Sequence, residues 1–337
     1  MRLLIILIVF YKLSINWGLT EEGDKKRWFV ETKGMHNRFR ILLKIYMYFG
    51  KIYSVIVFCY ERTQEVGKIM SNTFLKWAGG KRWFVNRENR RFPDEYNRYI
   101  EPFLGGGAVF FYLEPQEAIL SDINNELINT YIAVRDDIES VYRNLRIHER
   151  SHCREYFYQM RDRSTRTLAT SAARMIYLNK SCFNGIYRVN KQGKFNVPYG
   201  TREEITFEYN SLVEASNVLQ NAQIFCQDFE ATIDMAQEGD FIFCDPPYAV
   251  VDEENRFVGY NADVFSWQDQ IRLANALERA IDRNVKFIMT NIDHEDVRRL
   301  YENIEGVTLD TVQRQCFISG TADGRRTYQE LIVSANI

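Results

Sequence analysis

The chain has 337 residues, of which 46% are hydrophobic, and a formal net charge of −2 at pH 7. This length allows two domains, and the ordinary composition excludes a disordered chain while giving no overall sign of a nucleic-acid partner. No Cys-x-x-Cys pair occurs, which predicts reduced core thiols in a reducing compartment. The six cysteines are Cys59, Cys153, Cys182, Cys226, Cys244 and Cys316.

The first 69 residues carry two apolar stretches, 3–10 and 41–60, and no recognisable motif. The first stretch is too short to span a bilayer and lacks a small-residue cleavage site after it, and lysines interrupt the second. Gln64-Glu65-Val66 can be encoded by a purine-rich bacterial ribosome-binding sequence shortly before Met70. We therefore expect translation to start at Met70, with residues 1–69 outside the folded protein. A membrane-associating leader is the alternative.

Beyond Met70, strand-like and helix-like patterns alternate, which predicts a doubly wound α/β sheet. Apolar runs predict strands near 98–103, 117–121, 222–227, 240–244, 285–290, 308–314 and 328–334. Apolar spacing predicts helices over 80–90, 107–114, 124–134, 267–282 and 294–301. The firmest of these helices follows Ser266, which begins a capping-box pattern.

An Arg- and Tyr-rich segment, 136–205, interrupts this alternation and ends in a hairpin-like stretch at 188–197. Because it is too long for a loop, we expect a mainly helical domain at 136–205, inserted into a domain formed by 70–135 and 206–337. From residue 143 to residue 200 there are 12 Lys or Arg against three acids. Such a basic block inside an acidic protein indicates a polyanion partner, although a solvated helical surface is the plainer alternative.

Three segments carry residues suited to a ligand at the carboxyl ends of the strands. The triplet Gly105-Gly106-Gly107 follows the first predicted strand and lets a ligand approach the backbone, unless it is merely a flexible loop. It has neither the Lys-Ser/Thr of a phosphate loop nor the dinucleotide spacing. Asp122 ends the second strand, where it suits ribose hydroxyls or caps the next helix. Trp77 and Lys81 stand four residues apart around paired glycines.

Asp245-Pro246-Pro247-Tyr248 follows a nearly apolar strand and is the most informative motif. Prolines contribute no N–H, so the carbonyl oxygens of Asp245 and Pro246 face a pocket as acceptors without a competing donor. An amino group between these acceptors, beneath the ring of Tyr248, would be bound through both of its hydrogens. The alternative is a turn that only ends the strand.

Together these segments resemble the Dam-type (D12 class) family of site-specific DNA adenine-N6 methyltransferases. The resemblance extends from Phe74 to about Ile332. Its six motifs, in order, are FLKWAGGKR, EPFLGGGAVFF, SDIN, CFNGIYRVNKQGKFNVPYG, DPPY and SGTADGRRTYQEL. It implies a Rossmann-like, mostly parallel seven-stranded sheet, S-adenosylmethionine as cofactor and double-stranded DNA as substrate. We expect a site containing GA, with GATC as the first choice, and a cytoplasmic monomer without a membrane segment in its folded part.

The resemblance also assigns roles to individual residues. The catalytic residues would be Asp245, Pro246, Pro247 and Tyr248. The cofactor would contact Trp77, Lys81, Phe103, Gly105, Gly107, Asp122, Asp228, Phe229 and Asp245. DNA would contact Phe183, Asn184, Ile186, Arg188, Lys191, Lys194 and Pro198. Phe183-Asn184-Gly185 would be a wedge in the base stack, and Arg188 would read the guanine before the target adenine.

The expected reaction needs neither a metal nor a covalent intermediate. Acceptors at Asp245 and Pro246 would favour a pyramidal adenine N6, with the extruded base stacked on Tyr248 and the loop 249–265 closing over it. His148 and His152 have no second ligand cluster, so no metal site is expected. Two alternatives remain: a methyltransferase acting on RNA or protein glutamine, which usually carries Asn-Pro-Pro-Tyr, and an inactive DNA-binding module.

Overall fold

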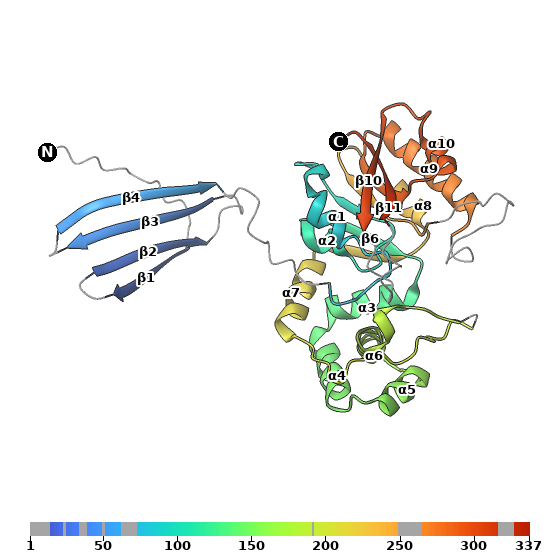
Figure 1. Ribbon diagram of the computed structural model, residues 1–337, viewed down its shortest axis with the longest axis horizontal. Coiled ribbons are helices and arrows are strands. Elements are labelled where there is room, and N and C mark those ends of the chain that lie inside the picture. The colour runs from blue at the N-terminus through green and yellow to red at the C-terminus, as the bar shows by residue number, and fades with distance from the viewer. Residues whose placement is uncertain are drawn as a thin grey trace. The chain divides into compact units, whose positions relative to one another are not determined.

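The computed structural model describes the backbone of residues 14–22, 25–33, 39–48, 51–61, 73–190, 192–248, 265–315 and 327–337. Side chains are described within 73–190, 192–248, 265–313 and 329–337. The chain divides into two compact units, Met1–Ile69 and Met70–Ile337 (Figure 1). Lys191, most of the expected closing loop and most of the last family motif lie outside the described residues.

The first unit contains a four-stranded antiparallel sheet in the order β1-β2-β3-β4. Its strands are β1 (Ser14–Glu22), β2 (Lys25–Lys33), β3 (Phe39–Tyr48) and β4 (Lys51–Glu61). Short connections join consecutive strands, as in an antiparallel meander. The sequence analysis assigned no strand here, because a short apolar run does not by itself distinguish a strand from a helix or a leader.

The second unit is built on a seven-stranded sheet in the order β10-β11-β9-β8-β5-β6-β7. Strands β5 to β9 are parallel where they pair, and β11 is antiparallel to both β9 and β10. The strands are β5 (Tyr99–Glu101), β6 (Ala118–Asp122), β7 (Ala222–Cys226), β8 (Phe241–Cys244), β9 (Lys286–Ile292), β10 (Val307–Gln315) and β11 (Thr327–Ala335). This confirms the doubly wound, mostly parallel sheet and all seven predicted strands.

Helices cover both faces of this sheet. Those that match predicted helices are α1 (Arg82–Arg87) with the short η1 (Asn89–Arg91), α2 (Ala108–Leu113), α3 (Asn125–Asp136), α9 (Trp267–Asp282) and α10 (Glu295–Tyr301). The capping box of α9 is present, since Ser266 and Asp269 bond each other's backbone N–H at 3.2 and 2.9 Å. A short helix, α8 (Phe229–Asp234), was not predicted, because six residues are too few to show a periodic pattern.

Four further helices lie between β6 and β7 after α3. They are α4 (Ile138–Arg150), α5 (Arg154–Asp162), α6 (Leu168–Ser181) and α7 (Tyr209–Leu219), with a 3₁₀ turn, η2 (Phe183–Gly185), after α6. In Figure 1, α4, α5 and α6 gather on the side of the unit away from β10 and β11. The predicted hairpin is confirmed by a bridge between Val189 and Phe195 and by Asn190 N–H donating to the Lys194 carbonyl at 2.9 Å.

The seven-stranded sheet has a hydrophobic core on each face, and successive residues of a strand point into opposite cores. In β8, Phe241 and Phe243 join a core cluster with α1 to α7, whereas Ile242 and Cys244 join a second cluster with α8 to α10. This follows from the two-residue period of a strand. The first cluster also contains Tyr177 of α6, so the predicted insertion and the sheet share one core. The boundaries 136 and 205 stay a prediction. No helix of the described residues is long and apolar enough to cross a bilayer.

We propose that residues 70–337 fold without the first unit, because the chain separates into compact units at Ile69 and Met70. A chain beginning at Met70 should unfold in one cooperative transition and bind S-adenosylmethionine as tightly as the full chain. Thermal unfolding and equilibrium cofactor binding measure both properties. A further deletion that removes Trp77 and Lys81 serves as the negative control. Aggregation of the Met70 chain would refute the proposal.

Candidate active site

The carboxyl ends of three parallel strands meet where the strand order reverses. β5 lies between β6 and β8. The strands β6 and β7 follow on one side of β5, and β8 and β9 lie on its other side. A crevice at such a point is where open α/β sheets bind ligands. The segments at this edge are Gly105–Gly107 after β5, here called the glycine loop, Asp122 at the end of β6, and Asp245–Tyr248 after β8.

Asp245 lies in this edge with its carboxylate largely removed from water. Its side chain is 19% exposed, and Oδ1 lies 2.6 Å from the Lys81 amino nitrogen. The Thr290 hydroxyl, from the adjacent strand β9, donates to the same oxygen at 3.0 Å. Burial raises the pKa of Asp245, while the Lys81 charge and the two hydrogen bonds oppose this rise. Asp245 is thus oriented through one oxygen by two neighbours.

Lys81, which directly precedes α1, supplies the positive charge in this site and is only 4% exposed. Its amino group donates to the Tyr248 hydroxyl at 3.0 Å and the Gly79 carbonyl at 3.2 Å. Glu330 of β11 lies 4.0 Å away. Burial alone would lower the pKa of Lys81, but Asp245, Tyr248 and Glu330 outweigh burial and raise it above its ordinary value. The lysine is therefore charged and bonded on three sides at this strand edge, here called the catalytic edge because it carries the predicted catalytic residues.

The glycine loop is shaped by its own neighbours. The Gly105 N–H donates to Asp122 Oδ2 at 3.1 Å, and the Tyr131 hydroxyl donates to the Gly105 carbonyl at 3.0 Å. Gly105 has a φ of +46°, and a Cβ there would lie 2.8 Å from the Trp77 ring. A glycine is required at this position by both the backbone and the tryptophan. Trp77, Gly105 and Asp122 are thus in one place, as the sequence analysis expected of a cofactor site.

A cluster of aromatic rings lies at the ends of β5 and β7. Phe103 stacks on Phe229 with ring centroids 5.2 Å apart, and Phe265 packs against both rings. Arg272 of α9 lies over the Phe229 ring at 4.8 Å and bonds Asp228 Oδ1 at 2.7 Å. Asp228 also caps α8 by accepting from the Glu230 N–H at 3.0 Å. The Asp228 carboxylate, which is predicted to contact the cofactor, therefore already carries a cationic partner.

The recognition segment, residues 183–190 and 192–198, follows α6. Phe183 is 48% exposed, and Asn184 and Gly185 both adopt left-handed backbone conformations. The Arg188 guanidinium donates from Nε to Asn196 Oδ1 at 2.8 Å, across the hairpin. Of the other predicted DNA contacts in this segment, Lys194 and Pro198 are exposed, while Ile186 is half-buried.

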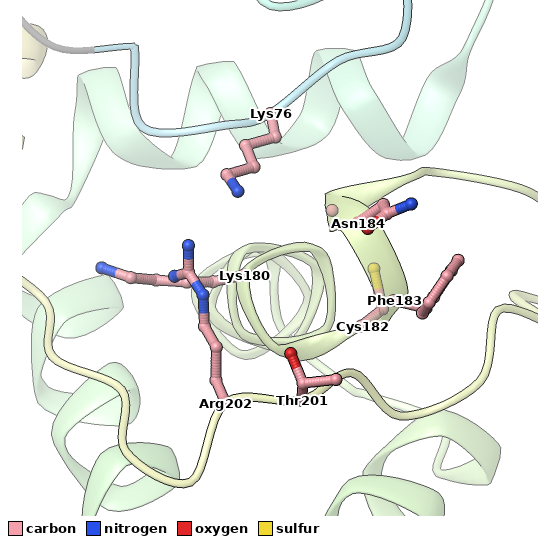
Figure 2. A pocket seen from close by; sticks show the side chains of 8 residues that line it. Lys76, Lys180, Cys182, Phe183, Asn184, Thr201 and Arg202 are labelled. Atoms are coloured by element: carbon pink, nitrogen blue, oxygen red, sulfur yellow. The ribbon is translucent and has the colours of Figure 1, made fainter. Parts of the chain in front are cut away.

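A pocket of about 160 Å³ opens beside this segment. Three cations line it: Lys76, Lys180 and Arg202 (Figure 2). Figure 2 shows the Lys76 amino group and the Arg202 guanidinium approaching from opposite sides, with Phe183 and Asn184 on the flank. Burial and the Arg202 charge lower the pKa of both lysines. Clustered cations of this kind favour an anionic ligand.

The structure brings together the predicted residues of the catalytic edge: Trp77, Lys81, Gly105, Asp122, Asp245 and Tyr248. Sequence reasoning missed Thr290 and Glu330 in this edge. Each carried a usable signal, since Thr290 is a polar residue near the carboxyl end of an apolar strand and Glu330 is a charge beside Leu331-Ile332-Val333. The side chains described here contain no group of three His, Cys, Asp or Glu that could hold a metal ion.

Removing Lys81 should destabilise the fold, because Asp245 would remain buried near Glu330 without its cation. We expect Lys81→Met to lower the free energy of unfolding by about 3–5 kcal/mol in urea titrations. Lys194→Met, at an exposed lysine of the hairpin, should change it by less than about 0.5 kcal/mol.

The contribution of Lys81 to the free energy of unfolding should decrease at alkaline pH. Because the folded-state pKa of Lys81 is raised, its contribution is fully present below about pH 10.4, the ordinary lysine pKa, and is lost as the pH rises through the folded value. The difference in unfolding free energy between the wild type and Lys81→Met should therefore be constant from neutral pH to that point and shrink above it. A difference that grows at alkaline pH would contradict the assigned ion pair.

This chain resembles known proteins over most of its length. The family model of the D12 class N6 adenine-specific DNA methyltransferases matches residues 77–315. A type II methyltransferase of Lactococcus lactis subsp. cremoris is 38% identical over 248 residues, covering 71% of this chain and 87% of that protein. The DNA adenine methylase of Haemophilus influenzae is 33% identical over 273 residues, covering 79% and 94%. The DNA adenine methylase of Escherichia coli is 30% identical over 267 residues, covering 78% and 94%.

The family match spans the recognition segment and every residue named at the catalytic edge except Glu330, and the sheet has the expected mostly parallel, doubly wound form. The chain therefore belongs to the D12 class of N6 adenine-specific DNA methyltransferases.

Proposed function

We propose that this enzyme transfers a methyl group from S-adenosylmethionine to N6 of an adenine that has left the duplex, within a GA-containing site and most simply GATC. The observation that carries the proposal is the orientation of Asp245. Lys81 and Thr290 both contact Oδ1, so we assign Oδ2 and the Pro246 carbonyl to the adenine amino group. A carboxylate fixed in this way needs no reorganisation when positive charge develops on the nitrogen.

The residues present fit S-adenosylmethionine, which supplies an electrophilic methyl group when bound. Carboxylates at the ends of the adjacent strands β6 and β7, Asp122 and Asp228, suit the hydroxyl and amino groups of a nucleoside. The stacked rings of Phe103 and Phe229 offer an aromatic surface beside Asp228. Arg272 already pairs with Asp228, so an adenine amino group would share the carboxylate with it or displace it.

The proposed chemistry uses positioning and charge. The N6 lone pair of adenine is delocalised into its ring, which makes the nitrogen a poor nucleophile. Hydrogen bonds from both amino hydrogens to Asp245 and Pro246 would favour a pyramidal nitrogen whose lone pair points away from the ring. Tyr248 would stack on the extruded base, and its hydroxyl is held by Lys81 at 3.0 Å.

DNA contacts are assigned to the recognition segment and the pocket beside it. The exposed ring of Phe183 suits a wedge between base pairs, and the cations Lys76, Lys180 and Arg202 suit the phosphates on its flank. Lys191, Lys194, Ile186, Asn184 and Pro198 complete the proposed contacts. Because one chain carries both the catalytic edge and this segment, we propose a monomer. The described cysteines are free thiols, which supports a cytoplasmic location.

The proposal is tested by methyl transfer from labelled S-adenosylmethionine to unmethylated plasmid DNA. We expect incorporation into adenine N6, and little into the same plasmid whose GATC sites are already methylated. Equal labelling of both plasmids would refute GATC as the site. Labelling of RNA or protein in place of DNA would refute the substrate class.

Asp245→Ala should lower the single-turnover rate by about 10²–10³, because it removes charge stabilisation that is realised mainly in the transition state. Duplex binding, measured by fluorescence anisotropy, should change little. The matched control is Asp310→Ala, which removes a surface carboxylate of β10 paired with Arg91 and should leave the rate unchanged. A rate for Asp245→Ala within a few-fold of the wild type would show that the catalytic centre lies elsewhere.

Arg188→Ala should lose about 1–3 kcal/mol of discrimination at the guanine before the target adenine, because a guanidinium can bond O6 and N7 of guanine together. The measurement is kcat/KM on GATC and on single-base variants at two salt concentrations. Lys194→Ala, in the same hairpin, is the control for a phosphate contact. It should weaken all sequences about equally and reduce the salt slope by roughly one unit. An unchanged guanine preference in Arg188→Ala would rule out base reading.

A further inference from the structure

Asn179, near the end of α6, binds the backbone of Lys76 from both sides. Its side chain is buried and 1% exposed. The Lys76 N–H donates to Asn179 Oδ1 at 2.8 Å, and Asn179 Nδ2 donates to the Lys76 carbonyl, also at 2.8 Å. The same Nδ2 lies 3.3 Å from the Gly185 carbonyl in the recognition segment. One buried amide therefore joins three segments of the chain.

A second contact, between Tyr187 and Trp77, also connects the recognition segment to the segment that contains Lys76. Tyr187 of the recognition segment stacks on Trp77, with ring centroids 5.0 Å apart and planes within 20°. The Tyr187 hydroxyl donates to Glu126 Oε2 at 2.8 Å, which anchors the ring to α3. Between the two contacts, Gly185 packs so closely on Lys76 that a Cβ would lie 2.4 Å from the lysine Cδ.

The chain of contacts then continues to the glycine loop. Trp77 fills the space beside Gly105, whose N–H binds Asp122. The exposed wedge residues at one end and the proposed cofactor carboxylate at the other are therefore linked by packed side chains and buried hydrogen bonds. Asn184 and Gly185 hold left-handed conformations, which both residue types tolerate, and the contacts of Gly185 with Asn179 and Lys76 hold this turn in place. A displacement of the turn by DNA must be taken up by Lys76 and Trp77.

We propose that Asn179 and Tyr187 are positioning residues that couple DNA recognition to cofactor binding, by holding the recognition segment in register with Trp77 and the glycine loop. This proposal rests on the proposed function and assigns its regulation to the same site. Neither residue touches the reacting atoms. Because coupling between two binding sites is reciprocal, its size is the ratio of cofactor affinities with and without DNA.

The test measures equilibrium binding of S-adenosylhomocysteine, which cannot react, to the full chain with and without a saturating short duplex containing one unmethylated GATC. We expect the duplex to tighten binding to the wild type by at least about fivefold. In Asn179→Ala this ratio should fall toward one. Tyr187→Leu, which removes the ring stack, should have the same effect. Tyr187→Phe keeps the stack and should retain the wild-type ratio.

The matched control is Asn144→Ala in α4, whose side chain bonds only within its own helix, to the Ser140 carbonyl at 2.8 Å. It should leave the ratio unchanged. If Asn179→Ala does not fold, the Tyr187 pair decides the question alone. A wild-type ratio of one, or equal ratios in Tyr187→Leu and Tyr187→Phe, would overturn the coupling while methyl transfer persists. A wild type that methylates no DNA would instead overturn the proposed function.

Discussion

The catalytic edge depends on one buried ion pair, Lys81 with Asp245. Removing a carboxylate from water costs free energy unless an opposite charge and hydrogen bonds compensate the lost hydration. Here Lys81 neutralises Asp245, and Asp245 neutralises Lys81. The pair also constrains the fold, because its surroundings come from distant parts of the chain. Lys81 precedes α1, Asp245 follows β8, and Thr290 and Glu330 lie within β9 and β11. The edge therefore forms only when these strands are already in register.

The hydrophobic clusters on the two faces of the sheet fix the register of these strands. Successive residues of β8 enter opposite clusters, so a slip of one residue would exchange both sets of side chains. The same packing extends to the recognition segment, because α6 shares the first cluster with the sheet. The segment that we propose to recognise DNA thus follows a helix packed against the sheet. A separate domain on a flexible linker would not provide this alignment, and Asn179 strengthens it with buried bonds to Lys76.

Charged side chains are paired at the ends of the strands but clustered with like charges in the pocket beside the recognition segment. The carboxylates at the ends of the strands are paired with cations of the same unit. Lys81 pairs with Asp245, and Arg272 pairs with both Asp228 and Glu230. The cations of the pocket in Figure 2 are instead crowded together, and burial, followed by repulsion from Arg202, lowers the pKa of both lysines. An anion placed there would relieve this repulsion. The net charge of −2 conceals this arrangement, because it averages over the whole chain.

Much of the second unit could be predicted from local pattern. The apolar run before Asp245 predicted β8, the glycines predicted the turn after β5, and Ser266 with Asp269 predicted the start of α9. These features depend on backbone stereochemistry and short-range periodicity, which neighbouring residues decide. The four strands of the first unit and helices α7 and α8 were not predicted, and α8, with six residues, is too short to show a period.

The sequence by itself determined the family and predicted which residues carry the chemistry, because the family motifs contain particular residue types in a fixed order. Only the tertiary structure decided how they are paired. It placed Thr290 and Lys81 on the same oxygen of Asp245, Arg272 on Asp228, and Asn179 on the backbone of Lys76. Each of these contacts joins positions more than 40 residues apart, where no local pattern constrains the distance. They depend on sheet order and core packing, which bring separate strand ends and helices to one edge.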